Sequence, residues 1–284
     1  MAEWYRKIKK GLPQTSIFKK ESEEGAWKKC PKCKLKSKED DLKVKLFVCN
    51  CGYHYRIGST VYFDFLFDDA AYKTLYHDLT IEKDDIFTDI ITYGERLKNA
   101  REKSGTNESI SIAKGKISGI DVIIGAMDFT FIGGTMGSVM GEKISLAIDE
   151  CILSRSPLVL ILRTGGARMM ESALALMQMT RLSAKLLQLS DASIPCISVL
   201  TDPTLGGVTA SIGMKADLVV AEPNALIGYS APRIIKESTG RDLPKGFQRS
   251  QFLMDHGFLD IIADREELKK TIYQFSRFIF EQSL

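Results

Sequence analysis

The chain has 284 residues, enough for one large domain and a small module. Its hydrophobic fraction of 44% and charged fraction of 26% are those of a soluble globular protein. No apolar run approaches the roughly 18–20 residues that cross a bilayer, so we expect no membrane association. Residues 1–10 are basic but lack the apolar segment and cleavage site of a signal peptide, which makes the cytoplasm the expected location. Six cysteines in a chain of this length do not indicate a disulfide scaffold.

The net charge of +3 hides an asymmetry. Residues 1–60 carry 15 Lys and Arg against 7 Asp and Glu, whereas the remainder carries 24 against 29. A basic module on a mildly acidic body suits a polyanionic partner, a charged subunit surface or simple solubility. Residues 1–25 are polar and lysine-rich, which predicts a flexible basic arm that either docks on a partner or is a disordered tail.

Residues 26–58 contain two closely spaced pairs of cysteines. Cys30 and Cys33 form a Cys-x-x-Cys, and Cys49 and Cys51 follow after an apolar alternation through residues 42–48. Two such pairs in a lysine-rich setting are typical of a zinc ribbon. Four thiolates would complete a tetrahedral structural Zn²⁺ site with no open position for chemistry. The metal would replace the hydrophobic core that a segment of about 30 residues cannot build.

The second cysteine pair departs from the usual ribbon pattern, because one residue separates Cys49 from Cys51 where most ribbons have two. The shorter spacing tightens this half of the site and can strain it. His54 lies three residues beyond Cys51 and is an alternative fourth ligand, and loss of the metal is a third reading. Cys151 and Cys196 fall in helical and strand patterns, so we expect them to be ordinary buried thiols.

Residues 59–284 alternate between strand and helix patterns. A strand hairpin is predicted in 110–131, and further buried strands at 158–162, 196–200, 217–221 and 225–227. Helices are predicted over 93–104, from about 138 to 151, over 169–189, and around 247–258 and 266–280, while 61–66 suits either type. The methionines of 169–189 indicate a core or a subunit interface. Repeated strand–helix units predict an α/β fold whose parallel strands are buried on both faces.

Two glycine pairs stand where a buried strand gives way to a helix. Gly165-Gly166 follows the strand at 158–162, and Gly206-Gly207 follows the strand at 196–200. Without Cβ atoms the backbone can turn sharply and approach a ligand closely. The N–H groups of a first helical turn have no partner within the helix, so they can face developing negative charge. The two pairs are therefore candidate oxyanion holes for acyl chemistry, or simply tight turns.

The residues around these glycines resemble the signature loops of the biotin-dependent carboxyltransferases. The two loops read Gly-Gly-Ala-Arg-Met at 165–169 and Asp-Pro-Thr-Leu-Gly-Gly-Val-Thr-Ala-Ser at 202–211. Other matching stretches lie at 133–139, 221–228 and 243–248, and the likeness runs from about residue 30 to about residue 265. The resemblance implies a crotonase-like ββα superhelix over 59–284 with a small N-terminal zinc ribbon. No strand is followed by the Gly-x-Gly-x-x-Gly of a dinucleotide-binding sheet.

The resemblance also implies a reaction and a set of site residues. A carboxyl group would pass from N-carboxybiotin to acetyl-CoA, giving malonyl-CoA, the first committed step of fatty acid synthesis. One oxyanion hole would be formed by Gly165, Gly166 and Ala167, and the other by Gly206 and Gly207. The acyl-CoA site would include Gly133, Gly134, Met136 and Gly137. Arg168 would hold a CoA phosphate or anchor its own loop by a salt bridge. Thr164 and Met170 replace the Ser and Gln more usual in this motif.

The best match within the family is the β chain of the bacterial, split-subunit form. This implies a homologous α subunit that supplies the biotin side of the active site, in an α2β2 assembly. It also implies a biotin carboxyl carrier protein and a biotin carboxylase as partners.

Three other functions remain open. The chain could carboxylate another acyl-CoA. An enoyl-CoA hydratase or isomerase would share the fold, although the second Gly-Gly loop argues against it. A nucleic-acid-binding protein would use the basic ribbon, with Phe47, Tyr53 and Tyr55 available for stacking on bases.

Overall fold

An eight-stranded sheet forms the centre of the computed structural model, which describes residues 27–81 and 87–282. The flexible arm expected over 1–25 lies outside the described residues. The strand order is β10-β8-β7-β6-β5-β4-β3, with β9 paired to β7 beside this path. The strands are β3 (Tyr72–Leu75), β4 (Ile110–Ile117), β5 (Ile120–Met127), β6 (Leu158–Thr164), β7 (Cys196–Leu205), β8 (Leu218–Ala221), β9 (Ile227–Gly228) and β10 (Ile261–Ile262).

One part of the sheet, from β5 to β10, is parallel, and the other part is antiparallel. β5, β6, β7, β8 and β10 run parallel, while β3, β4 and β5 form an antiparallel meander. All seven residues of β6 are buried, which explains its continuous apolar run. β6 and β7 are neighbours in parallel register, with Thr164 opposite Thr204. The loops that follow these two strands therefore both leave the sheet at the carboxyl-terminal ends of the strands, next to each other.

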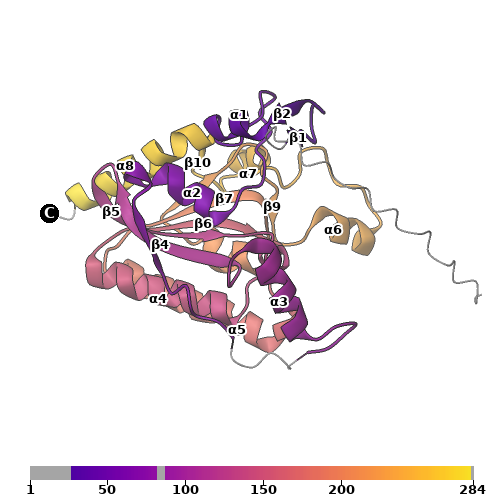
Figure 1. Ribbon diagram of the computed structural model, residues 1–284, viewed down its shortest axis with the longest axis horizontal. Coiled ribbons are helices and arrows are strands. Elements are labelled where there is room, and N and C mark those ends of the chain that lie inside the picture. The colour runs from indigo at the N-terminus through magenta and orange to yellow at the C-terminus, as the bar shows by residue number, and fades with distance from the viewer. Residues whose placement is uncertain (1–26, 82–86, 283–284) are drawn as a thin grey trace, which may run out of the picture.

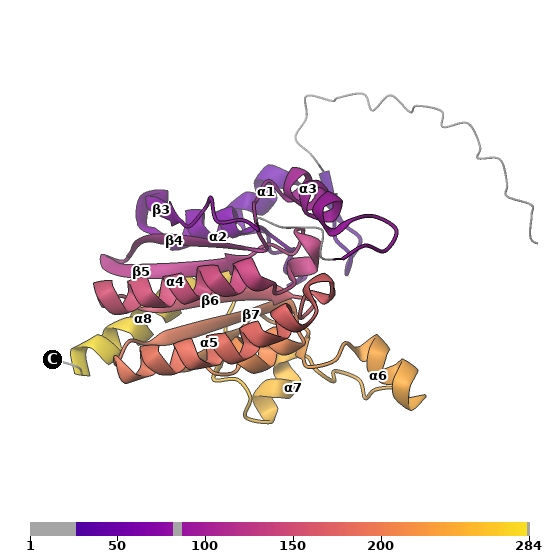
Figure 2. The same cartoon turned by 90° about the horizontal axis from the view of Figure 1, so that it is seen from below.

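Helices cover both faces of this sheet, as the two ribbon views show (Figures 1 and 2). One face packs against α4 (Ser138–Ser154) and α5 (Ala173–Asp191), and the other against α2 (Ser59–Leu66) and α8 (Arg265–Gln282). The remaining α-helices of the described body are α3 (Tyr93–Ser104), α6 (Pro232–Thr239) and α7 (Ser250–Asp255), and α6 projects away from it. None of the helices in the described ranges is both long and apolar enough to cross a membrane.

The two ends of helix α3 could be predicted because local residues cap them. Thr92 accepts a hydrogen bond from the Glu95 N–H, and the Glu95 side chain accepts one from the Thr92 N–H, which forms a capping box. Gly105 ends the helix in the left-handed region, at φ 72°. The predicted helix at 93–104 is confirmed to the residue.

The helix predicted over 169–189 starts later than expected. Met169–Glu171 forms a single 3-10 turn, and Ser172 takes a φ of 47° and a ψ of −123°, which no helix tolerates. The α-helix therefore begins at Ala173 and continues to Asp191. The residues after the second glycine pair form a π-helical turn, Thr209–Gly213, in place of an ordinary helix start.

The cysteine module packs on the same face of the sheet as α2 and α8. It contains β1 (Trp27–Lys29), β2 (Lys36–Lys38) and a short helix, α1 (Glu39–Val44). The apolar alternation at 42–48 is thus no strand, since it begins inside α1, where Leu42 is buried and Val44 is 85% exposed. Cys30, Leu42 and Phe47 belong to one hydrophobic cluster with residues of the sheet.

Arg265, the first residue of α8, joins this module to the body. Its guanidinium pairs with both oxygens of Glu222, at 2.6 and 3.1 Å. It also donates to the carbonyls of Leu46 and Tyr55, at 3.0 and 2.7 Å. The Tyr62 hydroxyl donates to Glu222 as well, at 2.8 Å. Arg265 and Glu222 are each about 1% exposed, so the hydrogen bonds that connect the module to the sheet here are fully buried.

Replacing Glu222 with Gln keeps the size of the side chain but leaves the Arg265 charge buried without a counter-charge. We expect the free energy of unfolding at pH 7 to fall by roughly 3–5 kcal/mol. Burial alone would raise the pKa of Glu222, but the Arg265 guanidinium lowers that pKa below its ordinary value of 4.5. The ionised carboxylate therefore stabilises the fold above about pH 4.5, and this contribution is lost as pH falls through the folded-state pKa.

The stability difference between the wild type and Glu222→Gln should accordingly shrink below pH 4.5, because protonated glutamate resembles glutamine. Denaturant unfolding at a series of pH values measures the difference directly. A difference that stays constant down to strongly acidic pH would show that the charge of Glu222 contributes nothing.

Candidate functional site

The two glycine loops touch each other at the edge of the sheet. Gly166 and Gly206 have φ angles of 118° and 73°, which side chains rarely allow. A Cβ on Gly206 would lie 2.8 Å from the Gly166 Cα, so the two backbones approach as closely as glycine permits. The loops were expected to form two separate oxyanion holes. Their contact places the two loops directly against each other.

Most of the predicted backbone donors are already used within the chain. The Gly165 N–H donates to the Gly133 carbonyl at 2.9 Å, and the Gly166 N–H donates to Thr164 Oγ1 at 2.9 Å. The Gly206 N–H donates to the Gly228 carbonyl at 3.0 Å. Among the described residues, the N–H groups of Ala167 and Gly207 have no such partner. These two, one from each loop, remain free to bind a ligand oxygen.

The loop at 133–137 lies against the first glycine loop and fixes its backbone. The Met136 N–H donates to the Gly166 carbonyl at 2.9 Å, and the Arg168 N–H donates to the Met136 carbonyl at 2.8 Å. A Cβ on Gly134 would lie 2.2 Å from the Arg163 carbonyl oxygen, so only glycine fits there. Met136 is fully buried, so its role in the site comes from its backbone.

Arg168 points away from solvent, into a buried group of polar side chains. It is 1% exposed and pairs with both oxygens of Glu108 and with Glu171. Burial alone would raise the pKa of Glu171, but hydrogen bonds from Tyr93 and from the Ser138 N–H, with the Arg168 charge, lower it. Of the two roles expected for Arg168, these contacts match loop anchoring and leave no guanidinium nitrogen directed at a phosphate.

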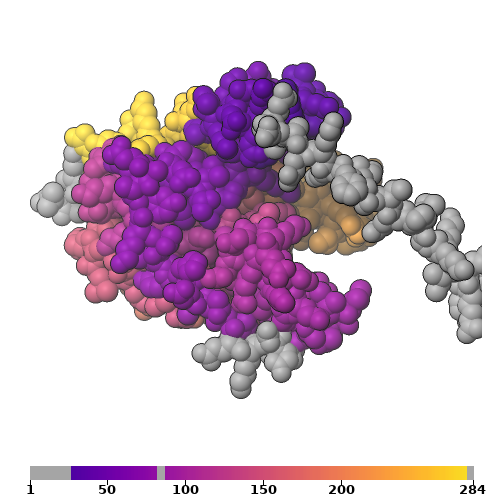
Figure 3. All heavy atoms as spheres, viewed as in Figure 1, coloured from indigo at the N-terminus to yellow at the C-terminus, as the bar shows by residue number. Residues whose placement is uncertain are grey.

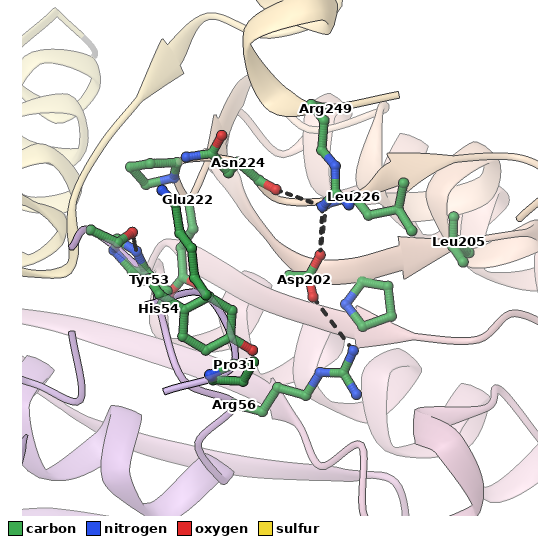
Figure 4. A pocket seen from close by; sticks show the side chains of 14 residues that line it. Pro31, Tyr53, His54, Arg56, Asp202, Leu205, Glu222, Asn224, Leu226 and Arg249 are labelled. Atoms are coloured by element: carbon green, nitrogen blue, oxygen red, sulfur yellow. Dashed lines mark hydrogen bonds and ion pairs between the residues drawn. The ribbon is translucent and has the colours of Figure 1, made fainter. Parts of the chain in front are cut away.

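A cavity of about 600 Å³ separates the cysteine module from the second glycine loop (Figure 4). Asp202 lies at its centre and accepts hydrogen bonds from Arg56 and Arg249, at 3.4 and 3.2 Å. Leu205, directly before Gly206, lines the same cavity. The sequence offered no sign of this cavity, because its walls come from segments about 150 residues apart. The space-filling view shows a further notch between the orange segment that carries α6 and the magenta segment that carries α3 (Figure 3).

The four cysteines of the module converge. Their Sγ atoms all lie within 4.8 Å of one another, and the pairs Cys30–Cys51 and Cys33–Cys49 are 3.6 Å apart. Four thiolates bound to zinc at about 2.3 Å would have sulfur atoms about 3.8 Å apart, so these residues fit a tetrahedral metal site. His54 is not in this group, since its Nδ1 lies 3.3 Å from the Gly52 carbonyl and its Nε2 lies 3.3 Å from Asp264. The Cys-x-Cys pair therefore brings both of its thiols into the cluster, and His54 lies outside it.

Two of the three aromatic residues considered for nucleic-acid stacking are unavailable. Phe47 and Tyr55 are buried, at 6% and 9% exposure, in the cluster that joins the module to the sheet. Tyr53 alone of the three is partly exposed, and it lines the cavity beside the module. Phe47 and Tyr55 are therefore not available for stacking on bases, although Trp27 of the same module is 54% exposed.

The comparisons with known proteins agree with this geometry. Residues 77–274 match the family model described as the carboxyl transferase domain. The acetyl-coenzyme A carboxylase carboxyl transferase subunit beta of Pedobacter heparinus is 49% identical over 273 residues, covering 96% of this chain and 97% of that protein. The subunit of the same name from Salinibacter ruber is 45% identical over 284 residues, covering 99% of this chain and all of that protein.

The chain therefore belongs to the carboxyl transferase family, and it is an enzyme of that class. Its branch of the family is that of the acetyl-CoA carboxylase carboxyl transferase β subunits. The enoyl-CoA hydratase and isomerase alternative is thereby excluded.

Solved structures confirm the crotonase-like fold. A transcarboxylase 12S chain superposes with a TM-score of 0.63 and 19% identity, covering 77% of this chain and 40% of that one. A chain of a Pseudomonas malonate decarboxylase hetero-dimer superposes with a TM-score of 0.61 and 19% identity, covering 78% of this chain and 86% of that one. At this level of identity the likeness concerns the fold alone.

The contact between the loops can be tested with two alanine substitutions that share the same backbone strain. Gly206 and Gly119 both have positive φ angles, 73° and 85°, and alanine costs about 1–2 kcal/mol in such a conformation. A Cβ on Gly119 would meet nothing within 4 Å, whereas one on Gly206 would meet the Gly166 backbone. We expect Gly206→Ala to lower the melting temperature clearly more than Gly119→Ala. Equal losses would mean that the loops are not in contact.

Proposed function

We propose that the chain transfers a carboxyl group from N-carboxybiotin on a carrier protein to acetyl-CoA, giving malonyl-CoA. The observation that carries this proposal is the pair of unused N–H groups, of Ala167 and Gly207, at the contact of the two glycine loops. Two unused backbone donors on adjoining loops suit the oxygen of a thioester as it becomes an enolate. The names of the relatives, at 45–49% identity over nearly the whole chain, support acetyl-CoA as the acyl substrate.

The chemistry requires little from side chains. Carboxybiotin, when bound, supplies CO₂ and a basic ureido group that accepts a proton from the acetyl methyl group. The N–H groups of Ala167 and Gly207 would hold the thioester oxygen and stabilise its negative charge while the methyl carbon attacks CO₂. The neighbouring N–H groups, already bonded within the chain, keep the two donors in place without reorganisation.

A second subunit would complete the site. The N–H groups of Ala167 and Gly207 are both assigned to the thioester side in this proposal, so the negative charge on the biotin side needs further donors, and we infer that a homologous α subunit supplies them. The exposed apolar side chains on the first turns of α5, and on the 3-10 turn before it, support this inference. Four large apolar side chains are exposed there, directly after the first glycine loop: Met169, Leu174, Leu176 and Met177. An exposed apolar patch of this kind marks a protein interface.

The proposed function predicts that the isolated chain has little activity. Malonyl-CoA and a free biotin derivative would be supplied to the chain alone, to the homologous α subunit alone and to the two together. We expect rapid decarboxylation of malonyl-CoA only in the mixture, and a lower rate with methylmalonyl-CoA. Full activity of the isolated chain would contradict the two-subunit site, and inactivity of the mixture would contradict the proposed reaction.

The oxyanion role of Gly207 predicts a large loss of turnover on substitution. A valine at 207 would place a branched side chain beside the N–H, but its Cβ would also lie 2.6 Å from Met179 Sδ. We therefore place Gly207→Val in a Met179→Ala background, with Met179→Ala alone as the control. One oxyanion donor is worth roughly 3–4 kcal/mol, so kcat should fall about a hundredfold to a thousandfold in a folded, assembled enzyme. Near-normal turnover would show that the glycine pair serves only as a turn.

We also propose that the four cysteines bind one structural Zn²⁺. Zinc is the metal that a closed tetrahedral set of four thiolates typically holds. Cys30 and Cys49 are buried, and the module has few apolar residues of its own, so metal ligation would supply the stability that the segment lacks.

Metal analysis tests this site and its fourth ligand. We expect one equivalent of zinc in the wild-type chain and in His54→Ala, and close to none in Cys33→Ser or Cys51→Ser. Retention of zinc by Cys51→Ser together with its loss from His54→Ala would show that histidine, and not Cys51, completes the site.

A further inference from the structure

A buried ionic cluster lies directly behind the first glycine loop and has no part in the chemistry described above. Arg168 is its centre, and it pairs with Glu108 through two nitrogens and with Glu171 Oε1 at 3.1 Å. The same guanidinium donates to the Tyr93 hydroxyl at 3.1 Å. The four side chains are at most 3% exposed. They come from segments up to 78 residues apart, so the fold assembles the cluster.

The cluster is connected to the free donor at Ala167 on both sides. The Gly166 carbonyl and the Arg168 N–H are both bonded to the backbone of Met136. The Arg168 side chain then returns to the same loop, where its Nη2 donates to the Thr135 carbonyl at 2.9 Å. The peptide that carries the Ala167 N–H is therefore held between two fixed neighbours.

Glu171 extends this support to helix α4. Its Oε1 accepts from the Tyr93 hydroxyl at 2.6 Å, and its Oε2 accepts from the Ser138 N–H, at the first residue of α4, at 2.6 Å. A Cβ on Gly137 would lie 2.3 Å from Glu171 Oε1, so the helix start fits closely around this carboxylate. The loop, the 3-10 turn and α4 thus share one set of hydrogen bonds.

We propose that Arg168, with Glu108, Glu171 and Tyr93, is a positioning residue that sets the direction of the Ala167 N–H. The inference rests on the proposed function, because it assigns the cluster a role in the proposed oxyanion hole. An oxyanion donor acts only when it is held in the productive geometry, and a shift of about 1 Å costs on the order of a hundredfold in rate. All three guanidinium nitrogens of Arg168 are bonded inside the chain, so the residue acts through the backbone and does not bind the substrate.

Two conservative substitutions test the proposal in the assembled enzyme. Arg168→Lys keeps the charge but replaces a planar fork of five donors with three donors on one nitrogen. Tyr93→Phe removes a single hydroxyl and keeps the ring, so it preserves folding if the lysine variant does not. We expect kcat to fall about tenfold to a hundredfold in Arg168→Lys and less in Tyr93→Phe, with the KM for the acyl-CoA unchanged within about twofold.

Hydrogen–deuterium exchange gives a readout that does not depend on activity. The amides of residues 165–168 should exchange faster in both variants than in the wild type, because the loop has lost part of its support. Arg265→Lys is the matched control, since Arg265 is equally buried and is also paired with a buried glutamate, Glu222, but has no hydrogen bond to either glycine loop. That variant should lower the melting temperature without changing kcat or the exchange of 165–168.

Three results would overturn the proposal. Unchanged kcat and exchange in folded Arg168→Lys and Tyr93→Phe would leave the cluster with a role in stability alone. A raised KM with unchanged kcat would show that Arg168 binds the acyl-CoA. Equal losses of kcat in Arg168→Lys and Arg265→Lys would show a general effect of buried charge. An inactive wild-type assembly would instead contradict the proposed function, and the exchange data would still report on the support of the loop.

Discussion

The close approach of Gly166 and Gly206 is the constraint on which the site depends. β6 and β7 are parallel neighbours, so the loops that follow them leave the sheet side by side. A side chain on Gly206 would occupy the space where the loops meet, since even its Cβ would be 2.8 Å from the Gly166 Cα. The sheet brings the two loops together, and the missing side chain of Gly206 lets the two backbones meet.

Two buried arginines, each paired with a buried glutamate, fix the segments around this contact. Arg168 supports the first loop from behind, and Arg265 fixes the cysteine module to the sheet. Removing an ion pair from water costs several kcal/mol per ion, and here additional hydrogen bonds to carbonyls and hydroxyls offset that cost. Such groups have one satisfactory arrangement, so they fix the relative positions of segments that apolar packing alone would hold less specifically.

The sequence was sufficient for the fold class, most helices and strands, and the position of both glycine loops. Local signals account for this success, as in α3, where a capping box and a left-handed glycine mark the two ends. The sequence did not predict the features that depend on contacts between distant residues. The partners of Arg168 lie up to 75 residues away, and the bond that removes Gly206 as a donor comes from Gly228. Ser172 interrupts its helix through a backbone conformation that no sequence pattern announced.

The candidate metal site likewise could be predicted from the sequence only in part. Cysteine spacing predicted four candidate ligands and left His54 as an alternative. In the structure the four thiols cluster, whereas His54 contacts Gly52 and Asp264. The cavity beside the module was invisible from the sequence, because its walls meet only after the module has packed on the sheet.

The bond between Arg265 and the Leu46 carbonyl also has a consequence for biosynthesis. The two residues are 219 positions apart, and Arg265 opens the last helix of the described chain. A chain emerging from the ribosome thus presents its cysteine module long before the arginine that fixes it exists. At a synthesis rate of about 5–20 residues per second, this interval lasts on the order of ten seconds or more. During that time the carbonyls of Leu46 and Tyr55 lack this partner, so the contact through Arg265 can form only after most of the chain has been made.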